Sequence, residues 1–211
     1  MFDAKKITML NFGVDFRNYF KLHRQITLAS RFAAATSFGK AKVAYFLGGT
    51  ENWIDVPTKM WNADTKVDDK AGYYYQTLET NLRGFQQNIR NGNSFALQNE
   101  EIRFPVFTYL FNTPIRSELI KNFQLVPFFD IGTAWQGKSP YALNNPFNTN
   151  SVTQGPIMVN VNYFREPVVY GYGAGARTVL FGYFVRFDYA WGVDSGARQK
   201  PIFYFSLSKD F

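Results

Sequence analysis

The sequence predicts an all-β fold, an antiparallel transmembrane β-barrel, and three observations support that fold class. Aromatic residues make up 19% of the 211 residues, yet the mean hydropathy of the chain is slightly negative. Apolar and polar residues alternate along several stretches of about ten residues, the length of a membrane-spanning strand. No window approaches the ~18 to 20 apolar residues that a transmembrane helix needs. Membrane barrels combine these features, because only every second strand residue meets lipid and aromatic girdles line both interfaces.

The first two predicted strands cover residues 7–17 and 25–38, with a short connection at residues 20–24. Each strand has one apolar and one more polar face, which is the period-two pattern of a strand between unlike environments. In the first strand, the apolar face carries Leu10, Phe12, Val14 and Phe16. A soluble sheet has the same pattern, so the alternation alone does not distinguish lipid from a protein core.

Residues 39–94 interrupt the alternation and are predicted to form a long loop with one short strand near Val43–Leu47. A second long loop is predicted at residues 136–166, which are rich in Asn, Pro and Gly. Long loops in compact domains are usually functional. Five further strands are predicted between and after these loops: 95–107, 122–135, 167–180, 183–192 and 201–211.

The connections alternate in length along the chain. The two long loops and the link 193–200 would meet at one end of the sheet, and the links 20–24, 108–121 and 181–182 at the other. Short turns on one side and long loops on the other are typical of outer-membrane barrels. Seven strands are fewer than the ~8 of the smallest bacterial barrels, and lipid does not tolerate open sheet edges. We therefore expect residues 1–211 to be the C-terminal part of a larger barrel.

The composition argues against several classes of partner and cofactor. The net charge is +7, but the Lys and Arg residues are dispersed, so nucleic acid is not an expected partner. The chain has no cysteine and a single histidine, His23, which excludes the usual zinc ligand sets. No metal, cofactor or catalytic residue is predicted, and the protein is not expected to be an enzyme.

A set of ordered motifs extends from residue 48 to the C-terminus. They are GGTEN at 48–52, NLRGF at 81–85, NEEIRFP at 99–105, FFDIGTAW at 128–135, GAGARTVLFGYFVRFDYAWG at 173–192 and FSLSKDF at 205–211. In this order and spacing, they resemble the C-terminal barrel signature of the BamA/TamA-like bacterial surface antigen family. The triplet RGF occurs by chance in many proteins, but the ordered set is specific, and the similarity covers nearly all of the chain.

The resemblance implies a roughly sixteen-stranded barrel of the bacterial outer membrane that inserts or translocates other proteins, with this chain as its last seven strands. The partners it implies are outer-membrane lipids, client outer-membrane or secreted proteins, and the remaining strands and periplasmic domains that precede the chain. About thirty residues separate GGTEN from NLRGF, whereas many family members have the two nearly adjacent. This insert, together with RNGNSFALQNEEIRFPVF at 90–107, is similar to barrels of Bacteroidetes, some of which are fused to propeller-like domains.

The resemblance also implies a role for the NLRGF loop, because family members hold the RGF arginine with acidic residues of the barrel wall. Strand parity places Glu101 and Asp130 on the lumen faces of adjacent strands. Arg83 has a planar guanidinium that suits carboxylates, so it is predicted to bridge Glu101 and Asp130 and lock the loop. Gly84 would permit a tight turn, and Phe85 would pack against lumen side chains.

Other interpretations of these residues stay open. Arg83 could be a solvated loop residue, with the two acids paired to arginines of neighbouring strands; the candidates are Arg103, Arg177 and Arg186. Glu101 and Asp130 could form a general acid and base, but no nucleophile or substrate pocket accompanies them. The glycines of GYGAGAR, residues 171–177, are predicted to face the lumen and leave room for the loop rather than to bind phosphate.

The C-terminal residue Phe211 is the second functional candidate. It lies on the same face of the last predicted strand as Phe203, Phe205 and Leu207. A terminal aromatic on such a strand resembles the signal that the outer-membrane assembly machinery reads. The alternative is an ordinary aromatic of the interfacial girdle.

Three functional hypotheses follow from the sequence. The first is a barrel that inserts or translocates proteins. The second is a barrel that serves as a membrane anchor or secretion pore for an N-terminal soluble domain, and the nature of the sequence before Met1 would discriminate these two. The third and weakest is a soluble β-sandwich with an aromatic core, which detergent-free solubility of a monomer would support.

Overall fold

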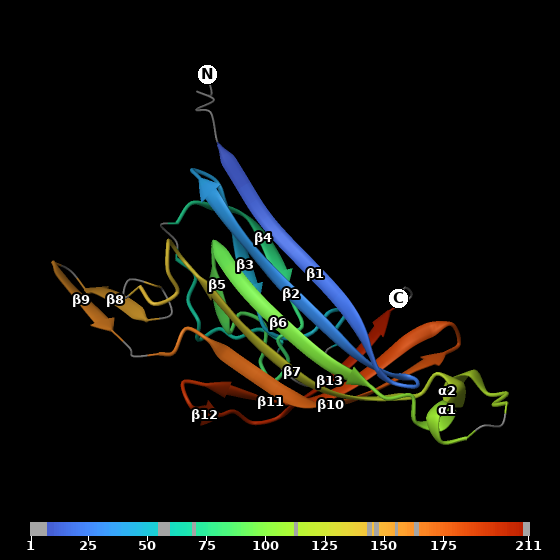
Figure 1. The fold of residues 1–211 in the computed structure, drawn as a ribbon. Helices are drawn as coiled ribbons and strands as arrows, with labels where there is room; N and C mark the ends of the chain where they lie inside the picture. Colours follow the sequence, from blue (N-terminus) through green and yellow to red (C-terminus); the bar gives the residue numbers. More distant parts are fainter. Residues whose placement is uncertain are drawn as a thin grey trace.

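Seven long strands of the computed structural model form one antiparallel sheet, which runs from β1 to β13 (Figure 1). They are β1 (Met9–His23), β2 (Ile26–Gly39), β6 (Ser94–Arg103), β7 (Gln124–Trp135), β10 (Val169–Leu180), β11 (Tyr183–Asp194) and β13 (Ile202–Ser208). The short β12 (Ala197–Arg198) also pairs with β11. The structure describes residues 8–54, 60–68, 71–111, 114–142, 145, 148–154, 156–162 and 165–208.

These strands are the seven that the alternation predicts, and the all-β, antiparallel fold class is confirmed. The observed strand ends differ from the predicted bounds at some positions. The first strand extends to His23 instead of residue 17, because Tyr19, Phe20 and Lys21 continue the pairing with β2. Residues 20–23 of the predicted connection 20–24 are therefore strand, and the turn is confined to residues 24–25.

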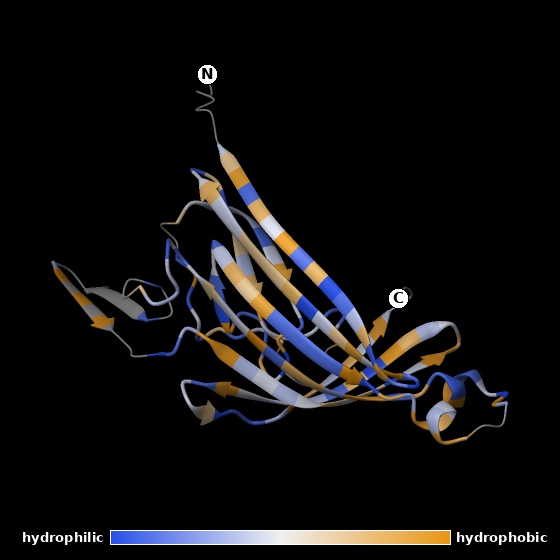
Figure 2. Cartoon of the chain, in the orientation of Figure 1, coloured by the Kyte–Doolittle hydropathy of each residue, from blue (hydrophilic) through white to orange (hydrophobic). Residues whose placement is uncertain are grey.

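The main sheet has two unlike faces. On β7, Val126, Phe128 and Asp130 are buried on one side, which we call the inner face. Leu125 and Phe129 point to the opposite, outer face and are 44% and 41% exposed. The stripes along β1 in Figure 2 show the same alternation of apolar and polar residues. Rows of exposed apolar side chains on the outer face are what a lipid-facing strand requires.

A second, smaller sheet packs on the inner face and comes from residues 39–94, which were predicted as one long loop and which we call the inner segment. It contains β3 (Lys42–Leu47), β4 (Tyr73–Glu79) and β5 (Arg90–Gly92), with β3 in the middle and parallel to β4. The predicted short strand at 43–47 is present as β3, whereas β4 and β5 were not anticipated. The largest core cluster joins this segment to the main sheet: Val43, Tyr45, Leu47, Leu82, Phe85 and Ile89 pack with Ala33, Phe95, Leu97, Ala134 and Val169.

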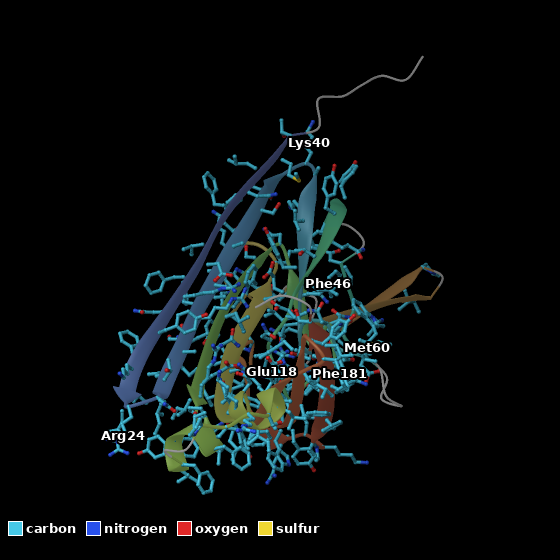
Figure 3. All side chains as sticks on the ribbon, turned by 90° about the vertical axis from the view of Figure 1, so that its right-hand side faces the viewer. Arg24, Lys40, Phe46, Met60, Glu118 and Phe181 are labelled. Atoms are coloured by element: carbon cyan, nitrogen blue, oxygen red, sulfur yellow. The ribbon has the colours of Figure 1, made fainter. Side chains whose placement is uncertain are left out.

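The connections separate into two ends of the sheet. The turns 24–25 and 181–182 lie at one end with α1 (Val106–Leu110) and α2 (Glu118–Lys121). The strand predicted at 95–107 ends at Arg103, so α1 begins before the link predicted at 108–121, whereas α2 lies within it. At the other end, the link predicted as a loop at 136–166 contains a hairpin of β8 (Thr149–Gln154) and β9 (Ile157–Asn162) (Figure 1). Figure 3 places Arg24 and Lys40 at opposite ends of the β1–β2 hairpin. None of the helices in the described residues is long and apolar enough to cross a membrane.

Candidate functional site

Arg83 lies at the tip of the inner segment, with only 1% of its side chain exposed. Its Nε donates to Asp130 Oδ2 at 2.7 Å and its Nη2 donates to Asp130 Oδ1 at 2.8 Å. Its Nη1 donates to Glu101 Oε1 at 2.8 Å, and its backbone N–H donates to Asp130 Oδ2 at 3.1 Å. The side chain therefore makes a bidentate pair with β7 and a single charged hydrogen bond with β6.

The surroundings of this ion pair are polar and aromatic. Asn99 Nδ2 donates to Asp130 Oδ1 at 2.8 Å, and the guanidinium carbon of Arg83 lies 3.6 Å from the centre of the Phe128 ring. The fully buried Asp188 carboxylate on β11 lies 3.8 Å from Arg83 Nη1. Burial lowers the pKa of Arg83, but these carboxylates outweigh it and hold that pKa above its ordinary value. The guanidinium is therefore a permanent buried charge.

The alternative pairing considered for the two acids also occurs, in addition to the contact with Arg83. Glu101 accepts hydrogen bonds from Arg177 and, through Oε2, from Arg103 at 3.2 Å. Arg186 pairs instead with Asp188, with 3.1 Å between Nε and Oδ2. Glu101 thus lies at the centre of a charged network that connects β6, β10 and the inner segment.

Glycines allow the backbone of the inner segment to touch the wall. A Cβ on Gly171 of β10 would lie 1.7 Å from the Arg83 carbonyl oxygen. A Cβ on Gly192 of β11 would lie 2.5 Å from the Gly84 carbonyl oxygen and 2.5 Å from the Phe85 ring. Gly84 itself has φ +94°, a conformation that favours glycine. Of the GYGAGAR glycines, Gly171 leaves space for the tip, and Gly192 adds space from β11, whereas the nearest neighbours of Gly173 and Gly175 belong to β7 and β11.

Tyr204 on β13 makes a further contact that the sequence did not single out. Its hydroxyl accepts from the Gly84 N–H at 2.9 Å and donates to the Phe85 carbonyl at 2.7 Å. The Tyr204 side chain is fully buried, and its ring packs edge-on against Trp53, with 4.8 Å between the centroids. Strand parity would have placed Tyr204 on the inner face, but its partner lies about 120 residues away in sequence.

The insert between GGTEN and NLRGF also reaches β13. The Ile54 N–H donates to the Phe205 carbonyl at 2.8 Å, and Trp53 forms an isolated antiparallel bridge with Ser206. GGTEN folds against NLRGF, because Thr50 Oγ1 and the Glu51 N–H both donate to Asn81 Oδ1. The two motifs are thus adjacent in space despite the insert.

A second buried ion pair fixes the inner segment nearer the opposite end. Arg90 of β5 is fully buried, and its Nη2 donates to Asp194 Oδ1 at 2.6 Å at the end of β11. The same nitrogen donates to the Glu166 carbonyl at 2.7 Å. Arg165, 32% exposed, lies 3.3 Å from Asp194 Oδ2. Sequence reasoning missed this pair, because Arg90 begins RNGNSFALQNEEIRFPVF without an expected role and Asp194 lies outside the predicted strands.

The other candidates contribute less to the site. Phe211 lies outside the described residues; Phe203 and Leu207 of β13 point to the outer face, 49% and 37% exposed. His23 has its Nδ1 3.1 Å from the Tyr109 hydroxyl. Within the residues that the structure describes, no three His, Cys, Asp or Glu side chains are arranged to hold a metal ion.

Comparison with protein families gives one match over nearly the whole chain. The model of the Omp85 superfamily domain matches residues 2–211. No curated protein and no solved structure matches the chain significantly.

Proposed function

This chain belongs to the Omp85 superfamily, and from that premise we propose that it inserts or translocates proteins with a loop locked to the barrel wall by Arg83. Members of the superfamily are proteins of the bacterial outer membrane that insert or translocate other proteins and are not enzymes. The lock would hold the tip at residues 82–85 against the lumen face of β6, β7, β10, β11 and β13.

The observation that carries this proposal is the set of hydrogen bonds from Arg83 to Asp130 and Glu101. Arg83 and Asp130 are 1% and 0% exposed, so neither charge has water as an alternative partner. Removing one member of a buried pair leaves an uncompensated charge and typically costs about 3–5 kcal/mol. The tip therefore has one strongly preferred position, and moving it would require that both strands release the guanidinium together.

A loop held in this way has a direct consequence for transport. The inner segment buries Leu82 and Phe85 in the core cluster with Leu97 and Val169 of the wall. The segment and the wall are therefore expected to move as one unit, and the lumen is occupied while the lock is closed. A client strand or polypeptide would meet this assembled surface rather than an open pore.

The test is to replace Arg83 in the full-length protein and measure client assembly in outer membranes. Arg83→Ala should lower the amount of folded client and increase protease cleavage of residues 80–89, because the tip loses its charged anchor. Arg83→Lys should give an intermediate result, since an ammonium cannot reproduce the bidentate pair. Arg17→Ala is the control, because the Arg17 side chain is 56% exposed and pairs only with Asp15 among the described residues.

The outcomes separate the insertion hypothesis from the alternative. If Arg83→Ala opens the loop to protease but client assembly stays at the wild-type level, the lock stands and the insertion role fails. The barrel would then serve as an anchor or secretion pore. An assay for the amount of N-terminal domain displayed on the cell surface would test this alternative. If the loop stays as protected as in the wild type, the lock itself is wrong.

A further inference from the structure

The link between β6 and β7 crosses to the outer side of the sheet, at the end where the short turns lie. On β10, Gly171, Gly175 and Arg177 face inward and are buried, so Thr178 faces outward. Thr178 Oγ1 donates to the Leu119 carbonyl of α2 at 2.7 Å. At the other side of the link, the Tyr109 hydroxyl of α1 contacts His23 at the β1–β2 turn. The link therefore runs along the outer rim from β1 to β10 (Figure 1).

This rim exposes large apolar side chains. Neither α1 nor α2 has a buried residue. In the link, Leu110 is 61% and Phe111 is 56% exposed, and at the tip of the β10–β11 turn Phe181 is 92% exposed. Phe181 has φ +53° and Gly182 has φ +81°, as a two-residue hairpin turn requires, and this turn carries the Phe181 ring beyond the ends of β10 and β11. Figure 3 places Arg24, Glu118 and Phe181 in its lower half, away from Lys40 at the top.

The charge of the rim is mostly positive. We define the rim patch as residues 19–25, 104–111, 114–123 and 180–183. Its exposed charged residues are Lys21, Arg24, Arg116, Lys121 and Glu118. Lys21 is paired in register with Thr27 and Arg103 on the inner face, so three cations and one acid remain at the outer side of the rim, on segments that are otherwise rich in Phe, Leu and Ile. Basic and apolar side chains on short amphipathic elements are the composition of segments that lie in a membrane interface.

We propose that the rim patch is a membrane-surface foot, which lies in the phospholipid headgroup layer at the short-turn end of the barrel. Two features select lipid as the occupant. The patch is continuous with the lipid-facing row of the strands, since its own Phe20 and Leu180 and the neighbouring Leu125 are exposed on the outer face. Its cations complement the phosphates of anionic headgroups, which long Lys and Arg side chains reach while their stems stay in apolar surroundings.

The foot explains why this link is longer than the turns beside it. A two-residue turn such as 24–25 ends at the rim, whereas the link 104–123 adds apolar surface outside the strands. The inference depends on the barrel spanning a membrane and not on the role of Arg83, so the failure of either proposal leaves the other intact.

Residues 1–211 contain no cysteine, so an introduced cysteine is the single labelling site once any cysteine that precedes them in the full-length protein is replaced by serine. The full-length protein carrying Leu110→Cys would be labelled with an environment-sensitive fluorophore and reconstituted in bilayers of phosphatidylcholine and phosphatidylglycerol with brominated acyl chains. The label should emit at shorter wavelength than in water and be quenched by the bromines. Phe16→Cys on the outer face of β1 is the positive control for insertion, and Tyr141→Cys, 67% exposed near the opposite end, is the water-facing control.

Quenching at position 16 without quenching at position 110 would overturn the foot, because the barrel would be inserted and the rim would be in water. The role of the charges has its own test. Reversal of both link cations, Arg116→Glu with Lys121→Glu, should lower the quenching at position 110, whereas Lys138→Glu near the opposite end should not. Equal quenching before and after the reversal would show that phosphates do not hold the rim patch.

Discussion

Arg83 is compatible with a stable fold only because its hydrogen-bond donors face charged acceptors. A guanidinium has five N–H donors and cannot lose its charge in a protein. Asp130 accepts two of them and Glu101 a third, while the Phe128 ring covers one face of the group. Burying these charges costs desolvation free energy, and removing one partner would leave an unpaired buried charge, which costs more. The tip of the loop is therefore expected to keep one defined conformation.

Tyr204 should stabilise the tip through its hydroxyl alone. Tyr204→Phe keeps the ring contact with Trp53 but removes the acceptor for the Gly84 N–H and the donor to the Phe85 carbonyl. Leaving these buried backbone groups unpaired should lower the free energy of unfolding by about 1–3 kcal/mol. The loss is measured by denaturant titration, with the folded fraction taken from the gel band of the unheated protein, which migrates differently from the heat-denatured protein. Tyr189→Phe, where the side chain is 44% exposed on the outer face, should be neutral; equal losses in both variants would contradict the role of the hydroxyl.

Gly171 should tolerate no side chain, because the backbone of the tip occupies the space beside it. The Cβ of Gly171→Ala would lie 1.7 Å from the Arg83 carbonyl oxygen, so the tip or β10 must shift. We expect the free energy of unfolding to fall by about 1–3 kcal/mol, the usual cost of overpacking a core. Protease cleavage within residues 80–89 should also be faster. Gly13→Ala on β1 is the matched strand control, with Ala35 Cβ at 3.2 Å as its nearest neighbour. Wild-type stability of Gly171→Ala would mean that the tip does not rest on β10.

At this scale, the sequence leads to those proposed site residues that a motif and strand parity identify together. Arg83, Glu101 and Asp130 could be proposed, and are in contact in the structure, because each lies in a motif and two of them lie on strands of known phase. Tyr204 could not be found in the same way. Its inward orientation follows from parity, but its partners are backbone groups of a segment whose position no local pattern encodes.

Replacement of Arg90 tests how β5 is held against β11. It connects β5 to the end of β11 and to the link before β10 through Asp194 and the Glu166 carbonyl. Arg90→Ala should cost about 3–5 kcal/mol, because a fully buried partner is removed. Arg165→Ala removes a half-exposed partner of the same Asp194 and should cost ~1 kcal/mol or less. Hydrogen exchange of residues 165–168 and of β5 should quicken in Arg90→Ala; equal exchange in both variants would argue against the anchor.

The strands of the main sheet were predictable because each separates two unlike environments. The strands of the inner sheet were not. The β5 strand is buried throughout, so its short RNG sequence carries no alternation. The β4 strand exposes consecutive residues, with Tyr74 and Tyr75 at 61% and 60%, and its pairing with β3 is a parallel contact across the insert. Tertiary packing rather than local pattern places both strands.

At the scale of the whole molecule, the sheet presents two different surfaces to two solvents. Its outer face carries apolar rows, and its inner face carries the charged network and the inner segment. Among the described residues, β1 pairs only with β2, so one edge of a fifteen-residue strand has free backbone groups. In hydrocarbon each unsatisfied backbone group costs several kcal/mol, and only a neighbouring strand can satisfy a whole edge.

The free edge of β1 should therefore be paired when the protein is in a membrane. Hydrogen exchange of the full-length protein in bilayers should show the amides of β1 protected along the whole strand, including those that point away from β2. The reference is β4, which is also an edge strand but belongs to the inner sheet, where water can satisfy the backbone. Slow exchange in β1 beside fast exchange in β4 is the expected result, since lipid supplies no hydrogen-bond partners. Exchange in β1 as fast as in β4 would mean that this edge meets water, and the sheet would then not close into a barrel at β1.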